Sequence, residues 1–291
     1  MYDFILQVTN IDKQFPGVHA LKDVSFSVLR GEVHGLIGEN GAGKSTLIKS
    51  ITGAYSYDSG SIIFIDETGT QFKIHNPSDA KAAGIAAAYQ DLLAAPELTV
   101  GENFFLGRIP KTSLGAVDWS YIYQYSSKIL REYGISVDPR KKMRQLTVSQ
   151  QMMVTIAKLS SEHAKLIIFD EPTALLPNQE VQTFYKILRK LRANGVSMIY
   201  VSHRLEEILE VCDRVTVLKD GAIVGTKETS SVTEGMLISM MVGRSMSDIY
   251  QINKGVPGAE VLRVEHLTRK NSFSDISFSL PLLSSFSKRS T

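Results

Sequence analysis

The chain has 291 residues, 43% of them hydrophobic and 21% charged, which suits one large globular domain or two small ones with a sizeable core. Its formal net charge of +2 gives no electrostatic case for nucleic acid as a partner, since nucleic-acid-binding proteins gather basic residues on one face. A single cysteine, an acidic N-terminus and the lack of a long uncharged apolar run exclude an internal disulfide, a signal peptide and a membrane-spanning helix, so we expect a cytosolic chain.

Short strands and one helix are predicted in the N-terminal part of the chain. Apolar residues alternate in some of these segments and run together in others, which is typical of half-buried and fully buried strands. The predicted strands cover residues 5–11, 24–29, 33–37, 61–65 and 85–89. An alanine-rich helix at 80–84 follows Asn76, whose side chain can cap free N–H groups of the first turn.

The pattern becomes mostly helical over residues 91–160, and strands and helices alternate again after it. Four consecutive apolar residues at 166–169 predict a strand buried on both faces of a parallel sheet. The other elements predicted there are helices at 180–193 and 206–211, a buried strand at 198–201, and a hairpin of 215–218 with 222–224. This order indicates an α/β fold with a doubly wound sheet, a helical insertion, and a nucleotide site at the carboxyl ends of the strands.

One internal repeat is visible. The segment 5–8 recurs at 261–264, and the segment 23–28 recurs at 275–280, in the same order and with the same apolar phase. We therefore expect a second copy of the domain to begin near residue 259, which divides the chain into domains 1–258 and 259–291. The repeat stops before a second phosphate-binding loop, and the serine-rich segment 281–291 shows no periodicity.

The clearest functional motif matches the pattern G-x-x-x-x-G-K-[ST] at every fixed position. It consists of Gly38, Glu39, Asn40, Gly41, Ala42, Gly43, Lys44 and Ser45. A predicted strand precedes it and a helix-like run begins at Thr46, which is the context that this phosphate-binding loop requires. The loop N–H groups and the helix N-terminus would bind phosphate, Lys44 would reach the β- and γ-phosphates, and Ser45 would hold Mg²⁺. The alternative is a glycine-rich turn that matches by chance.

Four further candidates stand where strands are predicted to end. Asp170 follows the buried strand 166–169 and could hold Mg²⁺, while Glu171 could polarise an attacking water as a general base. The alternative for this acidic pair is a cap for the next helix. Gln90 could sense Mg²⁺ or water, and His203 could contact a γ-phosphate, although either residue on its own is more often structural.

These motifs, together with the segment 146–150, stand in the order and spacing of the ATP-binding cassette (ABC) ATPases. Over about residues 4–280, the chain most resembles the tandem ATPase subunits of bacterial sugar importers of the ribose, galactose or xylose type. The stretches that carry this resemblance are 13–18, 38–47, 88–91 and 200–207. The resemblance implies a P-loop ATPase core with a mixed sheet and a helical subdomain.

The resemblance also implies a role for each matching residue. Phe15 would stack on the adenine of ATP, residues 38–46 would bind the phosphates, and Gln90 would couple the site to a permease. Asp170 would hold Mg²⁺, Glu171 would be the base, and His203 would act as the γ-phosphate switch. The signature segment, which binds the nucleotide of the opposite cassette, would be supplied by Thr147, Ser149 and Gln150.

An ATPase of this kind would work as a peripheral subunit on the cytoplasmic face of the inner membrane and would power sugar import. Its partners would be integral membrane permease subunits, a second cassette from the same or another chain, and, indirectly, a periplasmic sugar-binding protein. Permease and binding protein select the sugar in such importers, so this sequence does not identify it.

Three features differ from the family pattern. Ser149 replaces a glycine of the usual signature L-S-G-G-Q, and Pro177 stands where Asp or Thr usually helps the two sites communicate. A second signature does not follow the start of the repeat. We therefore expect intact ATP binding, with weak hydrolysis unless the chain pairs with itself or with another cassette. A soluble regulatory ABC module, an ATP-binding remnant without turnover, and a small-molecule kinase are the competing interpretations.

Overall fold

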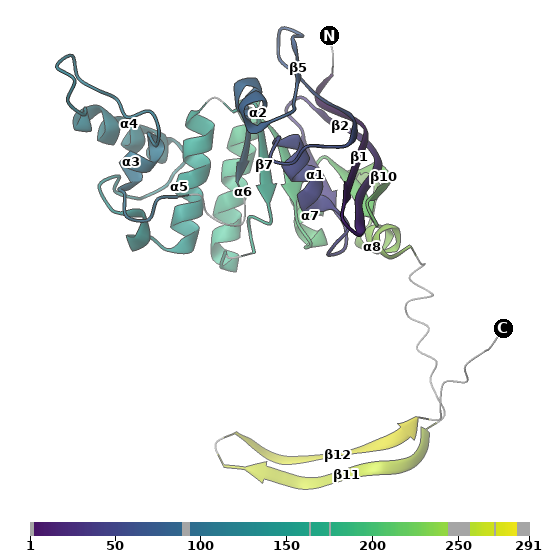
Figure 1. The fold of residues 1–291 in the computed structure, drawn as a ribbon. Helices are drawn as coiled ribbons and strands as arrows, with labels where there is room; N and C mark the ends of the chain where they lie inside the picture. Colours follow the sequence, from purple (N-terminus) through teal and green to yellow (C-terminus); the bar gives the residue numbers. More distant parts are fainter. Residues whose placement is uncertain are drawn as a thin grey trace. The chain divides into compact units, whose positions relative to one another are not determined.

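The structure is a computed structural model that describes residues 3–88, 94–162, 164–174, 176–243, 257–270 and 272–283. Contacts divide these residues into two units, one made of the described residues up to Gly243 and one made of those from Pro257 onward (Figure 1). In the described parts of the chain, no helix combines the length and apolar character needed to cross a membrane.

A six-stranded sheet in the order β10-β9-β3-β8-β7-β6 forms the centre of the first unit. Its strands are β3 (Val33–Ile37), β6 (Ile85–Ala88), β7 (Leu166–Asp170), β8 (Ser197–Val201), β9 (Arg214–Lys219) and β10 (Ala222–Glu228). All neighbours are parallel except β9 and β10, which form an antiparallel hairpin at one edge. The α/β fold with a mixed sheet is thus confirmed.

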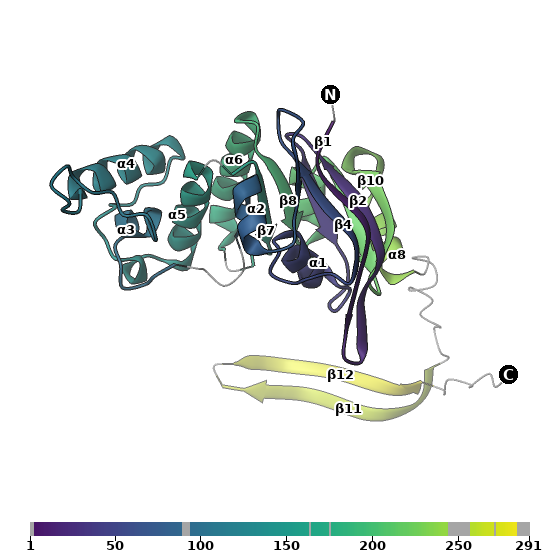
Figure 2. The same ribbon diagram turned by 45° about the horizontal axis from the view of Figure 1, so that its top comes forward.

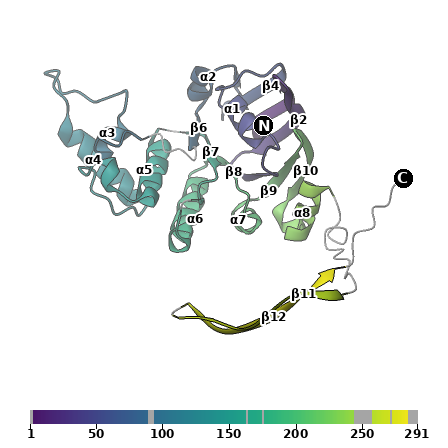
Figure 3. The same ribbon diagram turned by 60° about the horizontal axis from the view of Figure 1, so that its bottom comes forward.

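Helices cover both faces of this sheet, which explains why its central strands are continuous apolar runs. In β7, Ile167 and Phe169 point into one hydrophobic cluster, whereas Leu166 and Ile168 point into the other. Figure 3 shows helices along both faces of the sheet. They are α6 (Asn178–Ala193), α7 (Leu205–Val211) and α8 (Glu234–Val242) on one face, and α1 (Lys44–Ile51) and α2 (Pro77–Ala83) on the other.

A second, antiparallel sheet in the order β2-β1-β4-β5 packs over α1 (Figure 2). Its strands are β1 (Phe4–Phe15), β2 (Val18–Leu29), β4 (Ser59–Ile65) and β5 (Gln71–Lys73). The first two strands are longer than predicted, because backbone pairing continues past the apolar stretch to Gln14 with His19 and Phe15 with Val18. The tip of this hairpin therefore reaches the end of the unit where the glycine-rich loop lies.

Helices fill the segment between β6 and β7, and Figure 1 shows them grouped at one end of the first unit. They are α3 (Val100–Phe104), α4 (Trp119–Glu132), the short 3-10 helix Met143–Gln145, and α5 (Val148–Ser161). Phe104, Ile122 and Met153 join these helices through the same hydrophobic cluster that covers one face of the central sheet. This continuity ties the helical group to β7, the strand that carries Asp170.

The second unit is a hairpin of β11 (Pro257–Arg269) and β12 (Phe273–Leu283). Its register repeats that of β1 and β2: Leu262 pairs with Leu280 as Leu6 pairs with Val28. The register of this hairpin thus agrees with the repeat in the sequence. The segment from residue 281 onward shows no periodicity in the sequence, yet residues 281–283 belong to β12, because cross-strand pairing, with Pro281 opposite Glu260, continues beyond the apolar pattern.

The two hairpins differ in what covers them. Leu6 and Phe26 are buried in the first unit by α1 and the central sheet, with exposed fractions of 0% and 8%. Their counterparts, Leu262 and Phe278, are 45% and 47% exposed. Among the described residues, apolar side chains of the second hairpin are thus largely exposed where the matching side chains of the first hairpin are buried.

Candidate nucleotide-binding site

The glycine-rich loop connects β3 to α1, and two of its glycines are required by close contacts. A Cβ atom added at Gly38 would lie 2.2 Å from the carbonyl oxygen of Leu218 in β9. Gly43 has φ +106°, and its added Cβ would lie 2.5 Å from the carbonyl oxygen of Ala20 in β2. The loop is therefore held between β9 and β2 in a conformation that side chains at these positions would disrupt.

Lys44 begins α1 and is buried within the loop. Its ammonium group donates hydrogen bonds to the carbonyl oxygens of Gly38 at 2.8 Å and Glu39 at 3.1 Å. Burial lowers the pKa of Lys44, and the negative charges of Glu171 and Asp170 partly oppose this effect. The cation thus lies between the loop and two carboxylates, where a phosphate group would complement it.

The two carboxylates follow one another at the carboxyl end of β7. Burial raises the pKa of Asp170, the adjacent charge of Glu171 raises it further, and the charge of Lys44 opposes both. Glu171 has a left-handed backbone with φ +49°, which is uncommon for a residue other than glycine. Its N–H donates a hydrogen bond of 2.9 Å to the carbonyl oxygen of Val201 in β8. The chain thus turns sharply directly after Asp170, and both acidic residues line the same cavity.

His203 lies just beyond β8, the strand next to β7 in the sheet. Its Nδ1 atom is 3.2 Å from Oε1 of Glu171, and the histidine side chain is 56% exposed. The residue proposed as the switch and the residue proposed as the base, which are far apart in the sequence, are therefore in direct contact.

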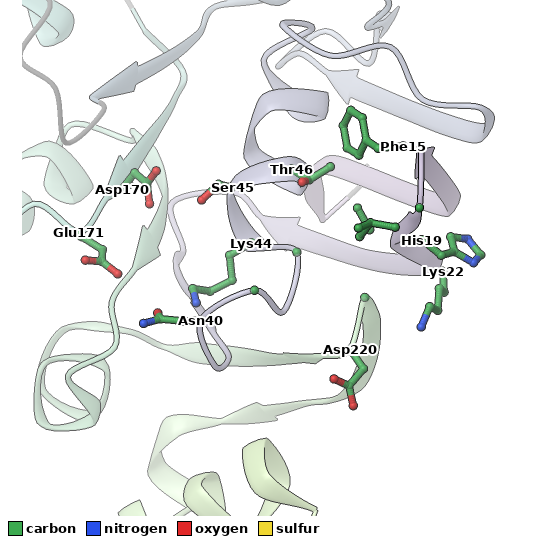
Figure 4. A pocket seen from close by; sticks show the side chains of 16 residues that line it. Phe15, His19, Lys22, Asn40, Lys44, Ser45, Thr46, Asp170, Glu171 and Asp220 are labelled. Carbon is green, nitrogen blue, oxygen red and sulfur yellow. The ribbon is translucent and has the colours of Figure 1, made fainter.

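Most of the predicted site residues line one cavity of about 870 Å³. The predicted residues that line it are Phe15, Asn40, Gly41, Gly43, Lys44, Ser45, Thr46, Asp170 and Glu171. In Figure 4 the two carboxylates lie at one end, Phe15 lies at the other, and Lys44 lies between them. An elongated molecule with phosphate at one end and an aromatic base at the other suits this order. Gly38, Glu39 and Ala42 belong to the same loop without lining the cavity.

Phe15 forms part of the rim at the tip of the β1–β2 hairpin. The ring is half-buried, contacts Tyr55 edge to face with 5.6 Å between ring centroids, and has the Lys13 ammonium 5.3 Å from its centroid. One face of a ring held in this way can stack on a planar base.

Residues without a predicted role in the site also line the cavity, and those with titratable side chains are His19, Lys22 and Asp220. The Lys22 N–H donates to the carbonyl oxygen of Gly221 at 2.7 Å, and the Gly221 N–H donates to that of Ala42 at 3.0 Å. These bonds join β2, the β9–β10 turn and the glycine-rich loop. The turn could be predicted from its Asp-Gly pair, but only the strand order places it beside the loop.

The predicted signature residues lie elsewhere, at the start of α5. Thr147 and Gln150 form a capping box: the Thr147 hydroxyl accepts from the Gln150 N–H at 3.2 Å, and the Gln150 side chain accepts from the Thr147 N–H at 3.1 Å. Ser149 is buried in the first helical turn, where the backbone has negative φ, so serine meets no strain in place of glycine. Gln90, the remaining site candidate, lies outside the described residues.

The residues at the phosphate end fit Mg²⁺, which prefers oxygen ligands and is usually bound through one or two carboxylates together with substrate phosphates and water. Ser45 offers a hydroxyl and Asp170 a carboxylate, and both line the cavity. Within the described parts of the chain, no three His, Cys, Asp or Glu side chains gather into a metal cluster. Mg²⁺ held here would thus depend on phosphate oxygens for its other ligands.

A buried strand, a glycine-rich loop and a helix N-terminus, facing a carboxylate at the end of a nearby parallel strand, define a P-loop nucleotide-binding protein. Residues 21–174, slightly more than half of the 291-residue chain, match the ABC transporter family. The chain therefore belongs to the ABC transporter family.

Curated relatives include importer subunits for three sugars. The chain is 43% identical to the xylose import ATP-binding protein XylG of Geobacillus kaustophilus, over 96% of this chain and 56% of the relative. It is 45% identical to the ribose import ATP-binding protein RbsA 1 of Streptomyces avermitilis, over 95% and 52%. It is 42% identical to the galactose/methyl galactoside import ATP-binding protein MglA of Yersinia pestis, over 96% and 54%. The chain thus spans about half the length of these relatives.

Solved structures agree with the fold. The ADP conformation of MJ1267, an ATP-binding cassette of an ABC transporter, matches with a TM-score of 0.71 and 27% identity, covering 83% of this chain and 99% of that one. A nucleotide-free ATP-binding cassette matches with a TM-score of 0.69 and 27% identity, over 85% and 98%. The dimeric cassette MJ0796, with a TM-score of 0.64 and 22% identity over 77% and 98%, supports the fold alone.

Proposed function

We propose that this chain binds ATP and Mg²⁺ in the cavity between the glycine-rich loop and β7, and hydrolyses ATP to drive monosaccharide import through a membrane permease. The observation that carries the proposal is the convergence of the loop, Asp170 and Glu171 on one cavity. The relatives named for xylose, ribose and galactose import support the substrate class.

ATP binding would use the N–H groups and the lysine of the glycine-rich loop. The N–H groups of the loop and the N-terminus of α1 carry partial positive charge toward the phosphates. The Lys44 ammonium would exchange its bonds with the Gly38 and Glu39 carbonyl oxygens for phosphate oxygens. Phe15 would stack on the adenine at the other end of the cavity. ATP binding thus needs no residue from outside the first unit.

Hydrolysis would add water to the γ-phosphorus, break its bond to the bridging oxygen of the β-phosphate, and release ADP and inorganic phosphate. Glu171 would accept a proton from the attacking water, and His203, in contact with Glu171, would stay close to the γ-phosphate. Ser45 and Asp170 would hold Mg²⁺, which, when bound, offsets the charge that develops on the phosphate oxygens. Lys44 would stabilise the same charge from the side of the loop.

A second cassette would complete each site. The segment that begins α5, with Thr147, Ser149 and Gln150, lines no part of the chain's own cavity, as expected for a segment that acts on the nucleotide of an opposite cassette. We further propose that residues 259–291 begin a second cassette within this architecture, since β11 and β12 repeat the register of β1 and β2. Permease subunits and, indirectly, a periplasmic binding protein would be the other partners, at the cytoplasmic face of the membrane.

The test is ATPase activity of the purified chain against protein concentration, with Glu171→Gln as the matched control. We expect specific activity that rises with concentration, because pairing supplies the signature segment, and its loss in the variant with ATP binding retained. Absence of ATP binding by the unchanged chain would refute the proposal. Co-purification with permease subunits tests the importer assignment separately.

The second candidate is an ATP-binding module with little turnover of its own. It is favoured by Pro177, which caps α6 without a side-chain bond and stands where the family usually has an Asp or Thr that helps the two sites communicate. Clear ATP binding, with flat activity equal to that of Glu171→Gln at every concentration, would select this candidate.

A further inference from the structure

A buried carboxylate that the proposed mechanism does not use lies behind the two catalytic loops. Glu207, in the first turn of α7, is only 3% exposed. Its carboxylate accepts hydrogen bonds from the Thr173 hydroxyl at 2.7 Å, the Tyr200 hydroxyl at 2.8 Å and the Ser202 hydroxyl at 3.1 Å. The Arg204 guanidinium lies 2.8 Å from it. A carboxylate buried this deeply is tolerated because its oxygens are satisfied and its charge is paired.

Apart from Tyr200, which lies in β8, these partners come from two separate segments that follow β7 and β8. Thr173 lies two residues after Glu171, in the loop that leaves β7. Ser202 and Arg204 are the immediate neighbours of His203, in the loop that leaves β8. One carboxylate therefore joins the segment that carries the proposed base to the segment that carries the proposed switch.

The hydrogen-bond network around Glu207 also contains the Tyr200 hydroxyl as a donor. Burial, followed by the charge of Glu207, raises the pKa of the Tyr200 phenol far above its ordinary range. The phenol therefore stays protonated and donates to Glu207 throughout the neutral range. Because β8 is buried at every position, Tyr200 anchors the carboxylate to the centre of the sheet.

The loop after β7 needs such an anchor. Glu171 adopts a left-handed backbone that costs free energy for a residue with a side chain, so surrounding contacts must maintain it. The described contacts on this loop include the bond from the Glu171 N–H to Val201, the bond from the Ala174 N–H to the Glu171 carbonyl oxygen, and the bond from Thr173 to Glu207. The bond from Thr173 is the one that ties the loop to the buried carboxylate.

We propose that Glu207 is a positioning residue, which ties Thr173 to the Ser202–Arg204 segment and thereby keeps Glu171 and His203 in contact for hydrolysis. This inference rests on the proposed ATPase function. Glu207 does not contact the nucleotide in this proposal. Changes in its hydrogen-bond network should therefore lower ATP turnover without weakening ATP binding.

The experiment compares Thr173→Val, which removes the hydroxyl and keeps the shape, with Thr173→Ser, which restores the donor. We expect the valine variant to lower kcat for ATP by about tenfold to a hundredfold, since small misplacements of reacting groups have effects of this size. The KM for ATP should stay within about twofold, and the serine variant should recover most of kcat. Thr155→Val is a matched control, because the described bond of the Thr155 hydroxyl, to the Gln151 carbonyl oxygen, lies within α5.

A second measurement does not depend on turnover. Amide hydrogen exchange at residues 202–204 should rise several-fold in Thr173→Val, although these residues lie on a different loop, and should return toward the unchanged value in Thr173→Ser. Glu207→Gln, which keeps the packing volume, should raise exchange in both loops. Unchanged exchange at 202–204, or a kcat loss that serine does not rescue, would overturn the inference. Equal turnover of the unchanged chain and Glu171→Gln would refute the ATPase function instead, and exchange would then decide the role of Glu207.

Discussion

Glu171 offers a direct test of how the fold stabilises its proposed catalytic base, because its backbone is left-handed with φ +49°. Replacing it with glycine removes the carboxylate and relieves the backbone at the same time. We expect Glu171→Gly to be more stable than Glu171→Gln, although neither variant should hydrolyse ATP. The glutamine variant keeps the strained backbone and the side-chain volume and loses the charge.

The size of the effect follows from two opposing terms. A left-handed conformation costs about 1–2 kcal/mol for an L-residue with a side chain. Glycine loses about 0.5–1 kcal/mol more conformational free energy on folding than alanine does. The difference leaves glycine more stable than glutamine by about 0.8 kcal/mol. The bond from the residue 171 N–H to Val201 should persist in both variants, because it uses only backbone atoms.

Urea unfolding followed by far-UV circular dichroism measures this difference. With an m-value of about 2 kcal/mol per M, the midpoint of Glu171→Gly should lie about 0.4 M above that of Glu171→Gln. Glu171→Ala serves as a further control, because it lacks both the charge and the conformational freedom of glycine. A glycine variant that is no more stable than the alanine and glutamine variants would show that the backbone at this position is not strained, and would refute the reasoning.

Three other changes test separate parts of the site. Gly38→Ala should abolish binding of a fluorescent ATP analogue and lower the free energy of unfolding by about 1–3 kcal/mol, because the added Cβ would collide with the Leu218 carbonyl oxygen. Gly225→Ala is the control and should change neither quantity, because its Cβ would contact only the flexible end of the Met240 side chain. The Mg²⁺-dependent gain in ATP affinity should be complete at neutral pH and lost as pH falls through the pKa of Asp170, since only the ionised carboxylate binds the cation. Burial raises this pKa above the ordinary value of 3.8. Titration of Asp170→Asn should show no such transition. Pro177→Asp should raise the free energy of unfolding by about 1 kcal/mol in thermal or urea melts, because Pro177 caps α6 without a side-chain bond. Proline also cannot donate an N–H to the side chain of Glu180, whose Oε2 is buried without a partner among the described residues. An unchanged melt would contradict this prediction.

The phosphate end of the site could be predicted from the sequence because its parts are local. The glycine-rich loop is contiguous, and Asp170 and Glu171 directly follow an apolar run that is typical of a buried strand. The repeat at residues 261–280 was visible for the same reason, since apolar phase is a property of neighbouring residues. Element ends were less predictable: β1, β2 and β12 all extend beyond their apolar patterns, because backbone pairing with a partner strand continues through polar residues.

The sequence by itself therefore determined the strand–loop–helix unit, the residue types at the strand ends and the class of fold. Tertiary structure decided the order β9-β3-β8-β7, which puts His203 beside Glu171 and the Asp220 turn beside the glycine-rich loop. It also decided the burial of Glu207 among donors from two loops. Strand order and these contacts depend on which apolar faces pack together across the whole chain. The local periodicity of a segment shows that one of its faces is apolar, but it does not show which other segment covers that face.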